Sequence, residues 1–198
     1  MGLFDRFLSR NEQLNDSYLD DVPEELLEIQ RLIPDEYIFN QIVSLEELRI
    51  LEKNSPTHWI YKYIDDPLQY SYRRLTLRSS MVGKYDKTVN YCSKGLEKFP
   101  NDPYLLYMLG RTFYDIGKIK EEIEYIREAL QVLDNAIYLY PDFPDAYFER
   151  GKCNLVLNCL DSAENDFLLA VEYESDELAI QGFNDYLEYL RDLKGSDI

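Results

Sequence analysis

The amino-acid sequence predicts an all-α solenoid of about three helix pairs, with a C-terminal capping helix and a helical N-terminal extension. Two observations carry this prediction. Apolar residues recur at helical spacing over residues 119–140 and again over 178–190. Residues of the same type also recur 34 positions apart. The 8 Gly and 8 Pro among 198 residues are few, as expected for helices joined by short turns.

The internal repeat has two different step lengths. Gly83 and Gly117 are 34 residues apart, whereas Gly110 and Gly151 are 41 residues apart. A fixed period of this size indicates stacked supersecondary units, each unable to bury its apolar face alone. Because 41 exceeds 34 by seven, the second unit is predicted to carry a seven-residue insert.

The insert is predicted to lie in the second helix of the second unit, over residues 119–140. Apolar residues follow one another there at alternating steps of four and three: Ile119, Ile123, Ile126, Leu130, Leu133, Ile137 and Tyr140. A heptad returns an apolar stripe to nearly the same helix face, whereas five or nine extra residues would turn it away from the core. Pro141 is expected to end this helix.

These spacings resemble the tetratricopeptide repeat (TPR) family, whose period is 34 residues. The third unit contains Ala163, Phe167 and Ala170, an A-x-x-x-F-x-x-A series typical of the second helix in that family. The resemblance implies a right-handed TPR-like solenoid. It divides the chain into an N-terminal extension (1–66) and a TPR-like domain (67–198) that has units at 69–102, 103–143 and 144–175 and a capping helix at 176–193.

Small residues have specific expected roles in this arrangement. Four of them are expected to let paired helices approach closely: Gly110, Gly151, Ala163 and Ala170. Gly83 and Gly117 are expected at inter-helix turns that need a positive φ, and Asn158 takes the place of Gly117 in the third unit because Asn tolerates that conformation. Asp176 is the expected start of the capping helix, and Gly195 its expected stop.

The family resemblance also implies a binding surface, because the first helix of each pair lines a concave groove. The corresponding positions are Tyr70, Arg73, Leu77, Tyr104, Tyr107, Arg111, Tyr114, Asp145, Phe148 and Lys152. Aromatic and arginine side chains are enriched at binding hot spots. Alternatively, these side chains cover one another or are covered by the N-terminal extension.

Some family members hold the C-terminal carboxylate of a chaperone with Lys, Arg and Asn side chains. Here Arg73 is the one suitable donor at the equivalent positions, while Leu77, Asp145 and Glu149 stand where polar or basic side chains are needed. The sequence therefore disfavours recognition of a chaperone tail.

Charge is distributed unevenly along the chain. The net charge of −17 divides into −9 over residues 1–68, +5 over 69–101, −3 over 102–140 and −10 over 141–198. A field of this sign repels nucleic acid and anionic membranes and attracts basic partners. The 18 tyrosines supply amphipathic side chains of the kind enriched at protein interfaces.

No catalytic, metal-binding or cofactor motif is recognisable, so no enzyme activity, metal or cofactor is predicted. The single histidine, His58, stands beside Trp59 and is expected to pack rather than to act as a base. Three cysteines without a C-x-x-C pair indicate neither a disulfide framework nor a zinc site and favour a reducing cytoplasm. Neither a signal peptide nor an apolar run long enough to span a membrane is expected.

The leading functional prediction is a cytoplasmic protein-interaction module, an adaptor or scaffold, that binds a partner protein or peptide through the concave groove and the basic first repeat. The alternative is an acidic immunity protein or secretion-type chaperone that neutralises a basic toxin or effector. An enzyme without a recognisable motif and a self-associating structural protein are further alternatives.

Overall fold

The computed structural model describes residues 67–196. The predictions for the N-terminal extension lie outside these residues. The chain divides into two compact units, Met1–Arg74 and Leu75–Ile198. All the described elements are helices: α5 (Pro67–Met81), α6 (Tyr85–Lys98), α7 (Pro103–Lys120), α8 (Ile123–Leu139), α9 (Pro144–Val156), α10 (Leu160–Tyr173) and α11 (Glu177–Ser196).

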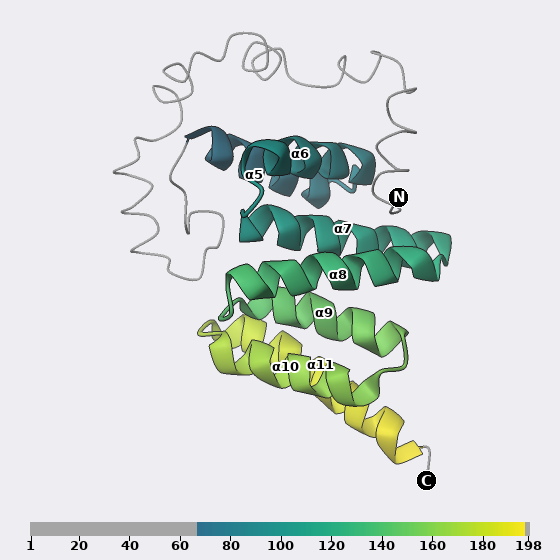
Figure 1. The fold of residues 1–198 in the computed structure, drawn as a ribbon. Helices are drawn as coiled ribbons and strands as arrows, with labels where there is room; N and C mark the ends of the chain where they lie inside the picture. The colour runs from purple at the N-terminus through teal and green to yellow at the C-terminus, as the bar shows by residue number, and fades with distance from the viewer. Residues whose placement is uncertain (1–66, 197–198) are drawn as a thin grey trace. The chain divides into compact units, whose positions relative to one another are not determined.

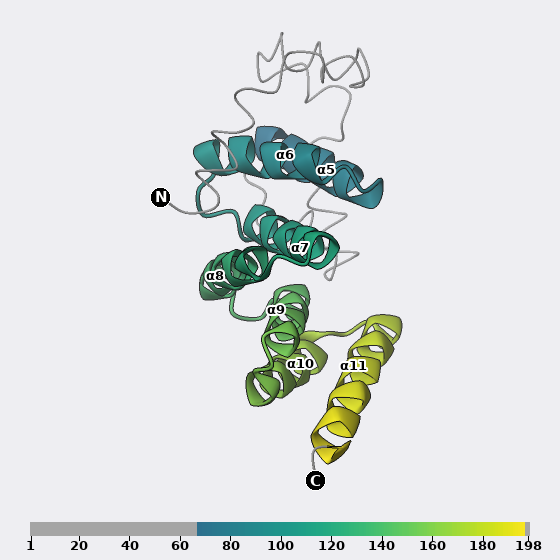
Figure 2. The same ribbon diagram turned by 90° about the vertical axis from the view of Figure 1, so that its right-hand side faces the viewer.

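Within the unit Leu75–Ile198, the helices stack in chain order. Helices α7 and α8 form one antiparallel pair and α9 and α10 the next, while contacts of α6 with α7 and of α8 with α9 join successive pairs (Figures 1 and 2). The second half of α5 faces α6 through a hydrogen bond of 2.8 Å between Ser79 Oγ and Thr88 Oγ1. Each helix contacts mainly its neighbours in the chain, which confirms the predicted all-α solenoid.

The three turns within helix pairs share one backbone geometry. A single residue in each adopts a positive φ: Gly83 (68°), Glu121 (57°) and Asn158 (59°). The N–H of the next residue then donates to a carbonyl five residues back: Lys84 to Ser79 at 2.9 Å, Glu122 to Gly117 at 3.0 Å and Cys159 to Asn154 at 2.8 Å. This arrangement satisfies carbonyl groups that the end of a helix leaves unpaired.

The expected turn positions of Gly83 and Asn158 are confirmed, but that of Gly117 is wrong. Gly117 lies inside α7, and Glu121 adopts the left-handed conformation instead. A Cβ on Gly117 would lie 2.8 Å from Ile126 Cδ1 and 3.1 Å from the carbonyl oxygen of Glu122. This glycine therefore serves close packing between α7 and the start of α8.

The predicted position of the seven-residue insert is also wrong, because the insert is divided between two helices. Eleven positions separate Gly110 from the turn residue Glu121, whereas seven separate Gly151 from Asn158, so four extra residues lie in α7. Helix α8 has 17 residues, against 14 in both α6 and α10. Because each helix is longer by about one helical turn, α7 and α8 still pair along their whole length up to the loop that joins them. Two helical turns added to α8 alone would leave the end of α8 without a partner.

The apolar series that indicated a single long helix runs across the turn. Ile119 and Ile123 are 64% and 36% exposed, and the buried stripe of α8 begins only at Tyr125 and Ile126. The apolar spacing alone did not distinguish these exposed residues from core residues. The lengthened pair therefore ends in an exposed tip at residues 118–124.

Small residues bring the paired helices together as expected. A Cβ on Gly110 would lie 2.7 Å from Leu133 Cγ, and a Cβ on Gly151 would lie 2.6 Å from the ring of Phe167. The A-x-x-x-F-x-x-A series is confirmed as core, because Ala163, Phe167 and Ala170 are all fully buried. Burial of a phenylalanine side chain of this kind contributes about 1.5–3 kcal/mol.

Helix α11 closes the C-terminal end of the stack. Asp176 Oδ1 accepts hydrogen bonds from the N–H groups of Leu178 and Ala179 at 3.1 and 2.9 Å, which confirms the expected start. The expected stop at Gly195 is wrong, because α11 continues through Ser196. Lys194 Nζ lies 2.6 Å from Asp161 and 2.7 Å from Glu164 of α10, so the last turn of α11 is tied to that helix.

Candidate functional site

The first helices of the second and third pairs, α7 and α9, contact each other and present one shared surface, which we call the α7/α9 face. It contains the predicted residues Arg111, Tyr114 and Lys152. It also contains Glu149, which is 5% exposed and connects the others. From the sequence alone, Glu149 was identified only as a residue unsuited to a carboxylate clamp. Its central position was not predictable, because it depends on how α7 and α9 pack against each other.

Glu149 forms ion pairs with basic side chains of both helices. Its Oε2 lies 2.7 Å from Lys152 Nζ, and its Oε1 lies 3.8 Å from Arg111 Nε. Arg111 Nη1 also donates to the hydroxyl of Tyr107 at 3.4 Å, and Lys152 Nζ lies 4.3 Å from the ring centre of Tyr114. We call these five side chains the Glu149 network. Its contacts fix the cationic groups of the face before any ligand is present.

Two further carboxyl groups on this face have raised pKa values. Burial is the largest cause that raises the pKa of Asp145 to about 7, and repulsion from Glu174 and Glu149 adds to it. The positive charge of Arg111 opposes this rise only in part. Burial also raises the pKa of Asp115, although Lys152 and Arg111 act in the opposite direction. The local cations therefore do not fully compensate the acidic groups of the face.

Helix α11 covers part of the predicted groove. The ring of Phe148 stacks on Phe183 at 4.5 Å between centres and meets Tyr186 edge-on at 4.9 Å. Phe148 therefore contributes to the packing of α9 against α11. The sequence placed Phe148 on the correct helix but contained no signal for which helix would cover it.

The remaining predicted groove residues differ in exposure. Tyr104 and Tyr107 are buried, and Tyr107 lies 5.1 Å from Phe143 between ring centres. Arg73 in α5 is fully buried and Leu77 is partly buried. The side chain of Tyr70 lies outside the described residues. The partly exposed predicted residues of the α7/α9 face are Arg111, Tyr114, Asp145 and Lys152, besides Phe148 under α11.

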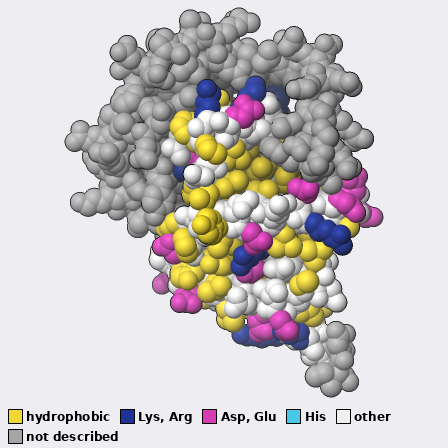
Figure 3. All heavy atoms as spheres, viewed as in Figure 1, with side chains coloured by type: hydrophobic (Ala, Val, Ile, Leu, Met, Phe, Trp, Pro, Cys, Tyr) yellow, Lys and Arg dark blue, Asp and Glu magenta, His cyan; other side chains and the backbone are white. Residues whose placement is uncertain are grey.

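Among the described side chains of the first repeat, exposed lysines lie on and next to α6. Lys84, Lys94 and Lys98 are exposed, whereas Arg73 is not. On the molecular face shown in Figure 3, the described basic side chains are interspersed with acidic and apolar ones and form no continuous stripe. The described part of the first repeat thus carries separate exposed lysines on and next to α6.

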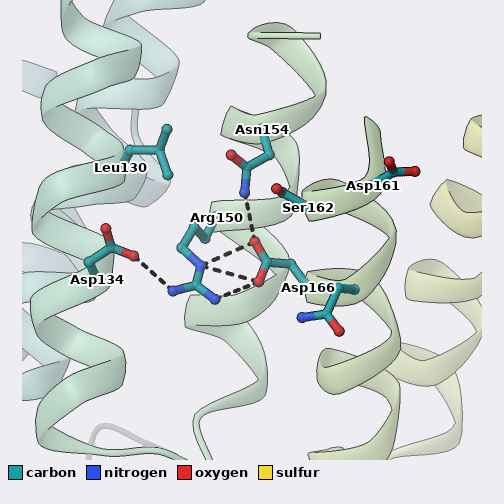
Figure 4. A pocket seen from close by; sticks show the side chains of 8 residues that line it. Leu130, Asp134, Arg150, Asn154, Asp161, Ser162 and Asp166 are labelled. Atoms are coloured by element: carbon teal, nitrogen blue, oxygen red, sulfur yellow. Dashed lines mark hydrogen bonds and ion pairs between the residues drawn. The ribbon is translucent and has the colours of Figure 1, made fainter. Parts of the chain in front are cut away.

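A second polar cluster joins α8, α9 and α10 (Figure 4). Arg150 of α9 contacts Asp166 of α10 through two guanidinium nitrogens, at 2.6 and 3.1 Å, and Asp134 of α8 through a third, at 2.8 Å. Asn154 also donates to Asp166 at 2.9 Å. Because Asp166 is 2% exposed and so well paired, we interpret this cluster, the Arg150 clamp, as structural: it holds α9 against α10 within the third repeat, and Asp134 adds a contact to the second repeat.

An open pocket of about 510 Å³ lies over the Arg150 clamp. Asp161, Ser162 and Asn165 of α10 and Leu130 of α8 line the rest of it. Arg150 already uses its guanidinium nitrogens on Asp134 and Asp166, so its positive charge is not available to a ligand in the pocket without breaking these contacts.

The described residues show no arrangement typical of catalysis. Within residues 67–196, no group of three or more His, Cys, Asp or Glu side chains is placed to hold a metal ion. Burial raises the pKa of the Cys92 thiol to about 12, which disfavours a reactive thiolate at neutral pH. None of the described helices combines the length and apolar character needed to span a membrane.

Solved structures with the same arrangement of helices identify the fold. The first TPR domain of the human RPAP3 protein, determined by NMR, superposes with a TM-score of 0.56 and 19% sequence identity, over 65% of this chain and 93% of that domain. The chain therefore has a TPR-like fold. The first TPR domain of Spaghetti (RPAP3), bound to the HSP90 peptide SRMEEVD, superposes with a TM-score of 0.56 and 18% identity, over 68% and 98% of the two chains. Neither a protein-family model nor a curated protein sequence matches this TPR-like chain.

Proposed function

We propose that this TPR-like chain is a protein-interaction module, an adaptor or scaffold in the cytoplasm, that binds a segment of a partner protein on the α7/α9 face. The observation that carries the proposal is the Glu149 network, which presents cationic and aromatic side chains from two adjacent first helices. A domain with a similar fold is bound to a peptide in its solved structure, which supports a peptide or protein as the ligand.

The Glu149 network is suited to binding because its side chains are already held in place. Arg111 keeps 42% of its side-chain surface exposed although it contacts Tyr107 and Glu149. Lys152 is held between Glu149 and the ring of Tyr114. Side chains fixed before binding lose less conformational entropy when a ligand arrives.

The charges of the α7/α9 face favour a partner segment that is not acidic. Arg111 and Lys152 are both engaged by Glu149, and Asp115 and Asp145 lie on the same face with raised pKa values. An acidic tail such as SRMEEVD would have to displace Glu149 from both cations. We therefore propose a neutral or basic segment as the ligand, with the exposed lysines of α6 lying outside this contact.

The proposal is tested by recovering partners from the native source with the full chain and two variants. Tyr114→Ala combined with Arg111→Glu alters the face, and Tyr138→Gln is the matched control, because Tyr138 on α8 is 84% exposed. A specific protein is expected with the wild type and the control but not with the double variant. The absence of any specific protein, or equal recovery by the double variant, would contradict the proposal.

The alternative is neutralisation of a basic toxin or effector by an acidic immunity protein or chaperone. It is favoured by the net charge of −17 and by the charge of −10 over residues 141–198. Electrostatic association of this kind weakens as salt screens the charges. A recovered partner with a basic surface and an affinity that falls steeply between low and high salt would favour this alternative over a general scaffold.

A further inference from the structure

The outer face of α11 carries apolar side chains that its position at the end of the solenoid does not require. A terminal helix is expected to turn a polar face to solvent. Instead Leu178 is 83% exposed and Tyr189 is 54% exposed. These residues lie on one side of α11 with Gly182 and Asp185 between them, at successive spacings of four, three and four. We call Leu178, Gly182 and Tyr189 the α11 stripe.

Gly182 at the centre of this stripe has no evident role inside the chain. Beyond its two neighbours and the backbone of its own helix, a Cβ at this position would have no heavy atom within 4 Å, whereas a Cβ on Gly151 would meet the ring of Phe167 at 2.6 Å. Glycine destabilises the middle of a helix relative to alanine. A glycine that makes no close contact within the chain leaves a notch where another helix backbone fits.

The charges around the α11 stripe indicate which charged residues a partner helix would carry. Both basic residues of α11 are directed to α10: Arg191 Nε lies 3.9 Å from Glu164, and Lys194 lies within 2.7 Å of both Glu164 and Asp161. The exposed charged residues nearer the stripe are acidic, namely Glu177, Asp185 and Glu188.

We propose that the α11 stripe is a second interaction surface, distinct from the α7/α9 face, and that it binds an amphipathic helix of a partner protein whose apolar stripe is flanked by Lys or Arg. The partner helix crosses α11 at Gly182, and its apolar residues contact Leu178 and Tyr189. Its basic residues face Asp185 and Glu188. A second copy of this chain suits the surface less well, because it would bring the same acidic residues together.

The test uses the full chain and a fluorescent 14-residue peptide of leucine and lysine, with leucine at the a and d positions of the heptads. We expect binding by anisotropy, a loss of affinity of at least about tenfold for Gly182→Trp and of several-fold for Leu178→Gln. Because Leu178 is exposed, Leu178→Gln should leave the fold intact. The proposal therefore stays testable even if Gly182→Trp unfolds the chain. The matched control Tyr138→Gln should bind within twofold of the wild type.

Three outcomes would overturn the proposal. The first is that Gly182→Trp and Leu178→Gln both bind the peptide as the wild type does. The second is equal binding of a peptide in which every lysine is replaced by glutamate. The third is a dimer in sedimentation experiments that Gly182→Trp abolishes, which would assign the stripe to a second copy. Recovery of a partner from the native source, which depends on Arg111 and Tyr114 and not on Leu178, tests the α7/α9 face separately, so failure here is distinguishable from failure of that face.

Discussion

Removing Arg150 should destabilise the third repeat, because it breaks the buried contact between α9 and α10 and the exposed contact from α9 to α8. Arg150 is the one side chain of the clamp that contacts both Asp134 of α8 and Asp166 of α10. The variant Arg150→Ala would leave Asp166, which is 2% exposed, with the side-chain amide of Asn154 as its remaining donor in this cluster. A buried carboxylate left without its cation is strongly unfavourable.

The magnitude follows from how differently the two aspartates are buried. Loss of one partner from a buried pair costs about 3–5 kcal/mol, so Arg150→Ala should lower the free energy of unfolding by this amount. Asp134 is 58% exposed, so Asp134→Ala should cost only about 0–1 kcal/mol. The double variant Arg150→Met/Asp166→Leu removes both charges and should recover most of the lost stability.

Urea denaturation followed by circular dichroism measures these differences, and hydrogen exchange shows where they act. For Arg150→Ala, amide protection should fall first in α9 and α10. A loss below about 1 kcal/mol for Arg150→Ala, or equal losses for Arg150→Ala and Asp134→Ala, would refute the interpretation of the clamp as a structural connection.

Four further substitutions test the packing, the turn geometry and the electrostatics by urea denaturation. Gly151→Ala should destabilise the chain by about 1–3 kcal/mol, because the added Cβ meets the ring of Phe167. Gly182→Ala should stabilise the chain by up to about 1 kcal/mol, because alanine favours the helix and nothing obstructs its Cβ. A stability change of the same sign for both variants would contradict the packing of these two glycines. Glu121→Gly should stabilise the chain by about 1 kcal/mol because φ is 57°, and a loss would contradict this backbone geometry. Burial raises the pKa of Asp145 to about 7, above its unfolded value of about 4, so its ionisation lowers stability as pH rises between these values. Asp145→Asn should therefore stabilise the chain at pH 8 by on the order of 2 kcal/mol and leave it unchanged near pH 4, and an equal effect at both pH values would contradict this assignment.

The repeat period and the small residues were sufficient to predict the helix pairs, because each unit depends on local contacts. Gly110 and Gly151 lie against the next helix as their spacing predicts, and Asp176 caps α11. The division of the insert was not predictable in the same way. The apolar spacing from Ile119 to Ile126 fits one continuous helix, and the turn at Glu121 lacks the glycine that usually marks such a position.

The candidate site was predicted only in part. The family pattern placed Arg111, Tyr114 and Lys152 on first helices, and the structure brings these three side chains into one network. The family pattern did not indicate that Glu149 would connect these side chains or that α11 would cover Phe148. Both features depend on the angle and distance between helices that are far apart in sequence.

The sequence by itself determined the helical class, the stacking of paired helices and the acidic character of the chain, because these depend on local periodicity and composition. The tertiary structure decided which of the predicted side chains remain exposed, since burial depends on neighbouring helices. It also decided the different roles of the glycines: Gly83 permits a turn, Gly151 permits close packing, and Gly182 has neither role within the described chain. The sequence shows the same residue at all three positions, and only the surrounding atoms distinguish them.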